Sequence, residues 1–191
     1  MKQVTKKYDF VVAGGGLSGM CAAMAAARLG AKTALVQDRP VLGGNASSEI
    51  RMHVCGADKH GSRENARETG IVEEILLKNR YLNPQHSFSV QDAVFWDCVS
   101  SEKNLDLYLN TRVLDADAAD GRIRSVRAVQ TTTETEYIFT AEFFADATGD
   151  GFIGYAAGAE SMYGRERRDT FGEPDAPARA DRHLMGSSIM V

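Results

Sequence analysis

A glycine-rich turn near the N-terminus constrains this chain more than any other feature. Phe10–Ala13 is a short apolar run of the kind that forms a buried parallel strand. The glycines that follow it, Gly14, Gly16 and Gly19, fit the pattern G-x-G-x-x-G, and an alanine-rich helix is expected from about residue 17 to residue 29. A strand, this turn and a helix in succession predict a βαβ unit that binds a dinucleotide.

Each glycine of this motif has its own expected task. Gly14 permits the tight turn, Gly16 lets the main chain approach a pyrophosphate, and Gly19 lets the helix pack close to the strand. The first helical residues, Leu17 and Ser18, present free N–H groups and the positive end of the helix dipole to the phosphates. A glycine cluster can also form an ordinary turn, but the strand before it and the helix after it favour a phosphate cradle.

The end of a second expected strand, at 33–37, bears on the adenosine ribose. In dinucleotide sites of this kind an acidic residue about 20 residues after the motif holds the ribose. Gln37 occupies that position here, and Asp38 follows it. The Gln37 amide can bond a ribose hydroxyl without charge assistance, while Asp38 either joins the site or faces solvent. Arg39 is close enough to reach the adenine or a phosphate, unless it is a solvated surface charge.

Two later glycine motifs extend the pattern. Leu42-Gly43-Gly44 follows the ribose position directly, and Thr148-Gly149-Asp150 ends a later apolar strand. With these motifs, most of residues 8–190 resembles the FAD-dependent oxidoreductase family of the glutathione-reductase-type flavoprotein superfamily. Gln37 departs from the acid that is commonest in that superfamily. The resemblance implies FAD as the cofactor, and it places against the FAD Gly43, Gly44, Asn45, Thr148, Gly149 and Asp150.

Two further helices are expected between the glycine motifs and the next strands. Thr69 is in position to cap the first, and Asn83-Pro84 ends it. Ser89–Asp92 matches a capping box, which predicts the start of the second helix.

The remaining strands complete the predicted fold. A three-stranded antiparallel β-meander is expected at about 112–140, with Asp120-Gly121 as a hairpin turn. A strand is expected at 105–109, and a buried strand at 143–147 is expected to return to the parallel sheet. Asp150 is an alternative cap for the helix that follows. The predicted class is α/β, a Rossmann-like parallel sheet flanked by helices. The resemblance implies that the meander packs on this sheet.

The polar segment 49–65 is expected to form a loop beyond the glycine pair. Glu49, Arg51 and His53 alternate along it, which would point all three to one side, toward the flavin or the substrate. Pairing within the loop is the alternative. These three residues are the candidates for catalysis, and no acid or base is assigned among them.

The cysteines and histidines indicate neither a disulfide framework nor a metal site. Cys21 and Cys98 fall in expected helices and are interpreted as core residues. The spacing of His53, Cys55 and His60 matches no common zinc pattern, so no metal is expected.

Composition narrows the class of protein. The formal net charge of -4 argues against a general nucleic-acid binder. No apolar stretch approaches the ~18 residues of a membrane-spanning helix. The basic start runs directly into a strand without a separate apolar segment, so no signal peptide is expected. A cytoplasmic globular protein with a small-molecule substrate is predicted.

The end of the chain differs from the rest. Residues 1–159 are expected to form the FAD-binding domain, and residues 160–191 a mobile, charge-rich arm and the start of a missing segment. The chain is interpreted as the FAD-binding portion of a flavin-dependent oxidoreductase, truncated and inactive alone. An NAD-binding reductase domain and a non-catalytic truncated domain are the alternatives. Self-association is expected through apolar groups that lack cover, namely Phe143, Phe144, Ile153 and Ile189.

Overall fold

The computed structural model describes residues 1–57, 62–63 and 66–186. Two compact units divide the chain, residues 1–157 and residues 158–191. His60 and Ile189, named above, lie outside the described residues.

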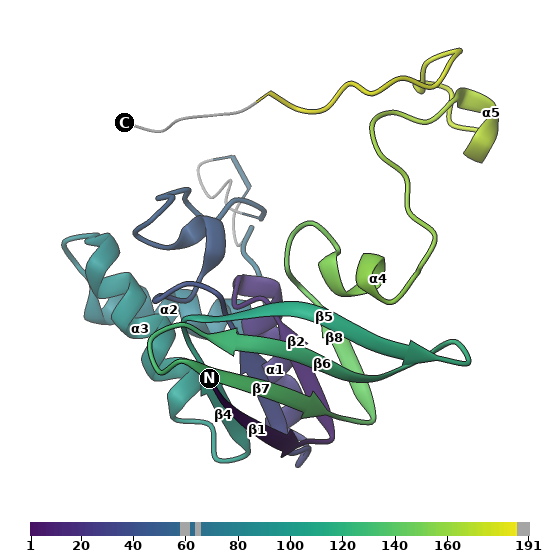
Figure 1. Cartoon of the computed structure of the whole chain (residues 1–191). Helices are drawn as coiled ribbons and strands as arrows, with labels where there is room; N and C mark the ends of the chain where they lie inside the picture. Colours follow the sequence, from purple (N-terminus) through teal and green to yellow (C-terminus); the bar gives the residue numbers. More distant parts are fainter. Residues whose placement is uncertain (58–61, 64–65, 187–191) are drawn as a thin grey trace. The chain divides into compact units, whose positions relative to one another are not determined.

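A parallel sheet forms the centre of the first unit (Figure 1). Its strand order is β4-β3-β2-β8, and every neighbouring pair is parallel. Strands β2 and β3 are buried because helices cover one face and a second sheet covers the other. This confirms the predicted Rossmann-like core. The strands are β2 (Phe10–Ala13), β3 (Thr33–Val36), β4 (Leu105–Tyr108) and β8 (Phe143–Asp146).

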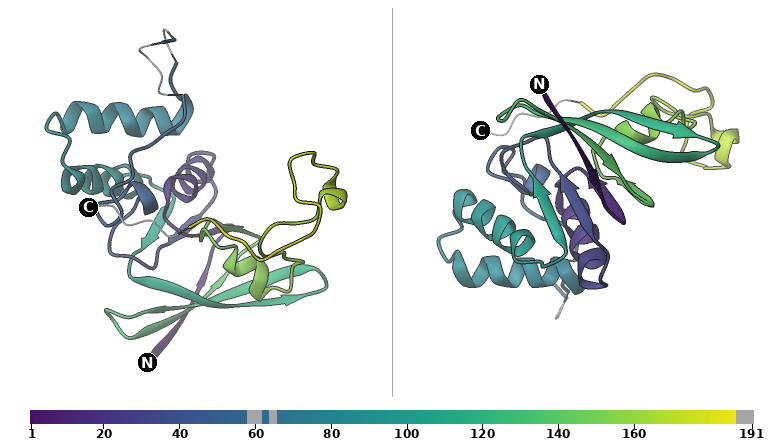
Figure 2. Two further views of the ribbon diagram at one scale, coloured as in Figure 1. Left: turned by 90° about the horizontal axis from the view of Figure 1, so that it is seen from above. Right: turned by 60° about the horizontal axis from the view of Figure 1, so that its bottom comes forward.

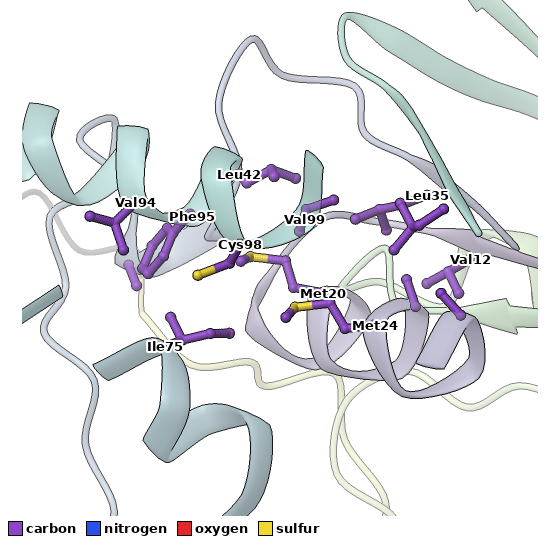
Figure 3. Close-up of a cluster of buried hydrophobic side chains, with 14 residues drawn as sticks. Val12, Met20, Met24, Leu35, Leu42, Ile75, Val94, Phe95, Cys98 and Val99 are labelled. Atoms are coloured by element: carbon purple, nitrogen blue, oxygen red, sulfur yellow. The ribbon is translucent and has the colours of Figure 1, made fainter. Parts of the chain in front are cut away.

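Three helices cover the first face of this sheet. Helix α1 packs on β2 and β3 and also contacts α2, while α2 packs on α3. Figure 3 shows the core between them, where side chains of all three helices form one buried cluster with Val12 and Leu35 of the sheet. The helices are α1 (Leu17–Arg28), α2 (Gly70–Leu82) and α3 (Phe88–Ser100).

A second sheet covers the opposite face, in the order β1-β7-β6-β5 (Figure 2). Strands β5, β6 and β7 form the expected antiparallel meander, and Asp120 and Gly121 turn its hairpin with positive φ. Strand β1 adds to it in parallel with β7 and was not predicted, because its residues are mostly polar and exposed. The strands are β1 (Lys2–Lys7), β5 (Thr111–Ala119), β6 (Arg122–Gln130) and β7 (Thr135–Thr140).

The expected capping box at Ser89–Asp92 is wrong. Helix α3 begins earlier, with Ser87 as its N-cap residue. The side chain of Asn83 fixes that start, since its Oδ1 accepts a hydrogen bond from the Ser87 N–H at 2.8 Å and its Nδ2 donates to the Ser87 carbonyl at 2.8 Å. Thr69 does stand at the N-cap of α2, although its side chain makes no capping hydrogen bond.

The expectation of uncovered apolar groups is only partly met. Phe143 is 61% exposed, whereas Phe144 is partly buried. Ile153 is 1% exposed because it packs into the core between the two sheets, so the expectation that it lacks cover is wrong. It belongs to the short helix α4 (Phe152–Ala156).

The second unit contains one short helix, α5 (Arg168–Phe171), among its described residues 158–186. Arg165 and Asp181 form an isolated antiparallel bridge, with reciprocal main-chain hydrogen bonds of 3.1 and 3.0 Å. Their side chains also pair, and the Arg165 guanidinium lowers the pKa of Asp181 to about 2. The mobility expected of this segment stays a prediction.

Candidate functional site

A cavity of about 740 Å³ opens in the first unit where the parallel strands end. Ligands of open α/β sheets bind beyond the carboxyl ends of the strands, and cofactor pockets have volumes of this order. The cavity is lined from five segments, within residues 13–18, 36–39, 43–55, 111–113 and 147–152.

The first glycine turn lies against the backbone on one side and faces free space on the other. Gly14 has a φ of +100°, and a Cβ there would lie 2.1 Å from the carbonyl oxygen of Ala147. A Cβ on Gly19 would lie 1.9 Å from the Gly14 carbonyl oxygen. A Cβ on Gly16 would meet nothing within 4 Å, although Gly16 lines the cavity. Gly14 and Gly19 therefore serve close packing, and Gly16 leaves room for a ligand.

The N-terminus of α1 is open toward this space. Gly16 is its N-cap residue, and no side chain makes a capping hydrogen bond there. The N–H groups of the first turn of a helix have no partner within the helix. Leu17 and Ser18 line the cavity, so their end of the helix is available to an anion.

The second glycine pair lies beside the first turn. The Gly43 N–H donates to the Gly15 carbonyl at 2.8 Å, and Gly16 and Gly43 form a parallel bridge. A Cβ on Gly43 would lie 2.5 Å from the ring of Phe95. The short 3-10 helix η1 (Gly44–Ala46) follows, with Gly44 and Asn45 at the cavity.

The end of β3 supplies three polar residues to the cavity. Gln37 is buried, Asp38 is exposed, and all of Gln37, Asp38 and Arg39 line the space. The Arg39 guanidinium lies 3.6 Å from the Glu49 carboxylate, which joins two residues that the sequence placed at separate parts of the site.

The segment after η1 is a turn and not the extended run that was expected. The N–H of Arg51 donates to the Ser47 carbonyl at 2.7 Å, and Arg51 has a φ of +65°. Glu49 and His53 line the cavity, whereas the Arg51 side chain donates to the Ser48 carbonyl at 3.1 Å. The turn therefore breaks the alternation on which the grouping of the three side chains was based.

Two residues of α3 that the sequence did not assign to the site hold this turn in place. The Asp92 carboxylate accepts a hydrogen bond from the Ser48 N–H at 2.9 Å. The Gln91 amide donates to the Ala46 carbonyl. The polar pair was visible in the sequence as the supposed capping box, but its partners lie 44 and 45 residues away.

The loop after β8 brings Thr148, Gly149 and Asp150 to the cavity. The Asp146 carboxylate organises this loop, since it accepts hydrogen bonds from the Thr148 hydroxyl at 2.7 Å, the Thr148 N–H at 3.1 Å and the Gly154 N–H at 3.0 Å. The Thr148 hydroxyl in turn accepts from the Phe152 N–H at 3.0 Å. Asp150 is not the cap of α4, because Gly151 occupies the N-cap position and Thr148 supplies the capping oxygen.

Substitution of Asp146 by Asn is expected to weaken this loop in a pH-dependent way. Desolvation raises the pKa of Asp146, but the hydrogen bonds from Thr148 and Gly154 outweigh it and lower the pKa below its ordinary value. A lowered pKa stabilises the fold above the unfolded value of about 3.9 and ceases to do so as the pH falls through the folded value. The melting temperature of Asp146→Asn should therefore lie below that of the parent at pH 7, and the gap should narrow from pH 4 downward. An equal gap at pH 7 and pH 3 would contradict this role.

The described residues show neither a metal cluster nor a membrane-spanning helix. The ranges 1–57, 62–63 and 66–186 contain no group of three or more metal-binding side chains. In the same part of the chain, no helix has both the length and the apolar character needed to cross a bilayer.

A parallel sheet, a glycine cradle at the carboxyl ends of its strands and an open helix N-terminus define a dinucleotide-binding α/β domain. Residues 9–188 match the family model of the FAD dependent oxidoreductases. The chain belongs to this family, and FAD is its cofactor.

Solved structures share the fold at low sequence identity. A geranylgeranyl bacteriochlorophyll reductase-like protein from Thermoplasma acidophilum has 19% identity and a TM-score of 0.55, over 83% of this chain and 43% of that one. THI4 from Thermovibrio ammonificans has 18% identity and a TM-score of 0.55, over 78% and 61%. The myxobacterial chondrochloren halogenase CndH, an FAD-dependent halogenase, has 16% identity and a TM-score of 0.56, over 84% and 41%. The chain thus spans less than two thirds of the length of each.

Proposed function

We propose that the cavity holds FAD with its pyrophosphate against the Gly14–Gly16 turn and the N-terminus of α1. The free space above Gly16 is the observation that carries this assignment. Main-chain N–H groups and the helix dipole would neutralise part of the phosphate charge. The position of Gly16 beside Gly43 lets both glycine loops approach the same ligand.

The flavin half is assigned to the part of the cavity that residues 43–45 and 148–150 line. Glycines in both segments allow a close approach of the main chain. Glu49 and His53 also face this space, which keeps both as candidates for contact with the substrate. Arg51 is a weaker candidate because its side chain is engaged at Ser48.

The proposed activity is an oxidation or reduction of a small molecule. FAD, when bound, supplies the chemistry of hydride exchange with a substrate carbon. The residues of this chain would bind the cofactor, orient it and keep the glycine loops in place. A cytoplasmic location is proposed as well, and the three free thiols, Cys21, Cys55 and Cys98, are compatible with a reducing compartment.

A thermal shift with two cofactors tests the proposal. A ligand that binds only the folded state at about 100 times its Kd adds about 2.7 kcal/mol of stability. For a chain of this size that corresponds to a rise in Tm of about 5–10 °C. FAD is expected to produce this rise, and NAD at the same concentration a much smaller one. A larger shift with NAD would favour an NAD-binding reductase domain, and no shift with either would favour a domain without a cofactor.

A further inference from the structure

The side chain of Gln37 binds one main-chain hydrogen-bond donor and one main-chain acceptor. Its Oε1 accepts a hydrogen bond from the Gly15 N–H at 2.8 Å, and its Nε2 donates to the Val41 carbonyl at 3.0 Å. An N–H group needs an acceptor and a carbonyl needs a donor, so a side-chain amide satisfies both. A carboxylate at this position would offer acceptors only, and it would leave the Val41 carbonyl opposite a negative charge.

Close packing keeps Gln37 in this arrangement. The residue is 5% exposed. Its main-chain N–H donates to the Tyr108 carbonyl at 2.8 Å, and its carbonyl accepts from the Thr111 N–H at 2.8 Å. A Cβ on Gly15 would lie 3.0 Å from the Cβ of Gln37 and 2.6 Å from the Leu42 side chain, which shows how tightly the two loops meet. The amide is therefore engaged in holding the glycine turn to the second glycine loop.

Asp38 has the opposite situation. It is exposed, it lines the same cavity, and within residues 1–57, 62–63 and 66–186 no hydrogen bond or ion pair holds its carboxylate. Its neighbour Arg39 is paired with Glu49. A carboxylate has two oxygens that can each accept a hydrogen bond from one hydroxyl of a vicinal diol.

We propose that Asp38 binds the 2′- and 3′-hydroxyls of the adenosine ribose, and that Gln37 is a positioning residue that holds the two glycine loops together. This inference rests on the proposed binding of FAD in the cavity. It resolves the choice between the two residues that the sequence alone leaves open.

Three variants separate the two roles: Gln37→Glu, Asp38→Asn and, as a matched control, Asp117→Asn. Asp117 is an exposed carboxylate on β5 that does not line the cavity. Asp38→Asn is expected to weaken FAD binding about tenfold, because a charge-assisted hydrogen bond is lost, with the Tm of the FAD-free protein unchanged. Flavin fluorescence titration measures the affinity, and the control should bind FAD as the parent does.

The ribose contact is tested directly with ADP and 2′,3′-dideoxy-ADP as competitors of FAD. The parent should prefer ADP about tenfold, since only ADP carries the diol. The preference should fall to about onefold in Asp38→Asn and persist in the control.

Gln37→Glu gives the sharpest contrast. If Gln37 occupied the ribose subsite, an acid there would tighten FAD binding through a charge-assisted bond. We expect the reverse at pH 8, a loss of about tenfold, because the introduced carboxylate cannot donate to Val41. Burial raises the pKa of the introduced carboxyl, and its protonated form can donate. The Tm of FAD-free Gln37→Glu should therefore approach that of the parent at pH 5 and fall below it as the pH rises.

Each part can fail separately. Tighter FAD binding by Gln37→Glu, or an undiminished preference for ADP in Asp38→Asn, would overturn the inference while the parent still binds FAD. A parent that binds neither FAD nor ADP would overturn the proposed function and the ribose assignment with it. A pH-independent Tm difference for Gln37→Glu would refute the role of Gln37 even then.

Discussion

Gly16→Val is expected to abolish FAD binding while the protein stays folded. Gly16 has a φ of -68° and a ψ of 176°, which a valine adopts without strain, and its Cβ would have no neighbour within 4 Å. The branched side chain would instead fill the space assigned to the pyrophosphate. The affinity for FAD should fall about 100-fold or more, equivalent to at least about 2.7 kcal/mol. The free energy of unfolding should change by less than about 1 kcal/mol.

Gly14→Val provides the contrasting control for this experiment. Its Cβ would lie 2.1 Å from the Ala147 carbonyl oxygen, and its φ of +100° is one that valine rarely adopts. This variant should fail to fold or melt far below the parent, whereas Gly16→Val should show a parental circular dichroism spectrum and no flavin fluorescence quenching. If Gly16→Val bound FAD as tightly as the parent, the cradle would have been assigned wrongly.

Phe95→Ala is expected to cause a large loss of stability. Phe95 is completely buried in the core cluster that α3 shares with α1 and α2 (Figure 3). Truncation of a buried phenylalanine to alanine costs about 3–5 kcal/mol, through lost burial and the cavity that remains. The ring also lies against Gly43, where a Cβ would come within 2.5 Å of it. FAD affinity should therefore fall as well, because the second glycine loop loses its support.

Trp96→Ala is the matched control for Phe95→Ala. Trp96 is the next residue of α3 and is 52% exposed, so its removal should change the free energy of unfolding by no more than about 0.5 kcal/mol. Urea denaturation of both variants measures the difference. Equal losses of stability in the two would show that the core of the first unit does not depend on the Phe95 ring.

The sequence was most informative where the cause of a structure is local. The turn at Gly14 depends on neighbouring residues, and the apolar run Phe10–Ala13 by itself predicts a buried strand. The hairpin at Asp120-Gly121 is local in the same sense. Strand β1 was missed because only its pairing with β7, more than 130 residues away, makes it a strand. The residue pattern of Lys2–Lys7 does not indicate this pairing.

The same distinction separates the parts of the site. Gly43 and Gly44 could be placed from their motif, and both line the cavity. The hydrogen-bond partners of Gln91 and Asp92, in the segment 46–48, could not be predicted. The helical spacing of α3 shows which of its faces is apolar, but it does not indicate which loop packs against the helix. The left-handed backbone of Arg51 was also beyond prediction, since a turn closed by the Ser47 carbonyl overrides the alternation that its neighbours suggest.

The order of the strands in the parallel sheet sets a limit on how early this chain can fold during synthesis. Strand β2 lies between β3 and β8, and β8 ends at residue 146. The glycine turn also has its closest packing partner, Ala147, at that end of the sequence. A ribosome adds roughly 5–20 residues each second, so β8 is synthesised on the order of ten seconds after β2. During that interval one edge of the apolar strand β2 has no partner strand. Contacts between such distant segments form slowly, and the nascent chain is exposed to aggregation and to chaperones throughout that interval.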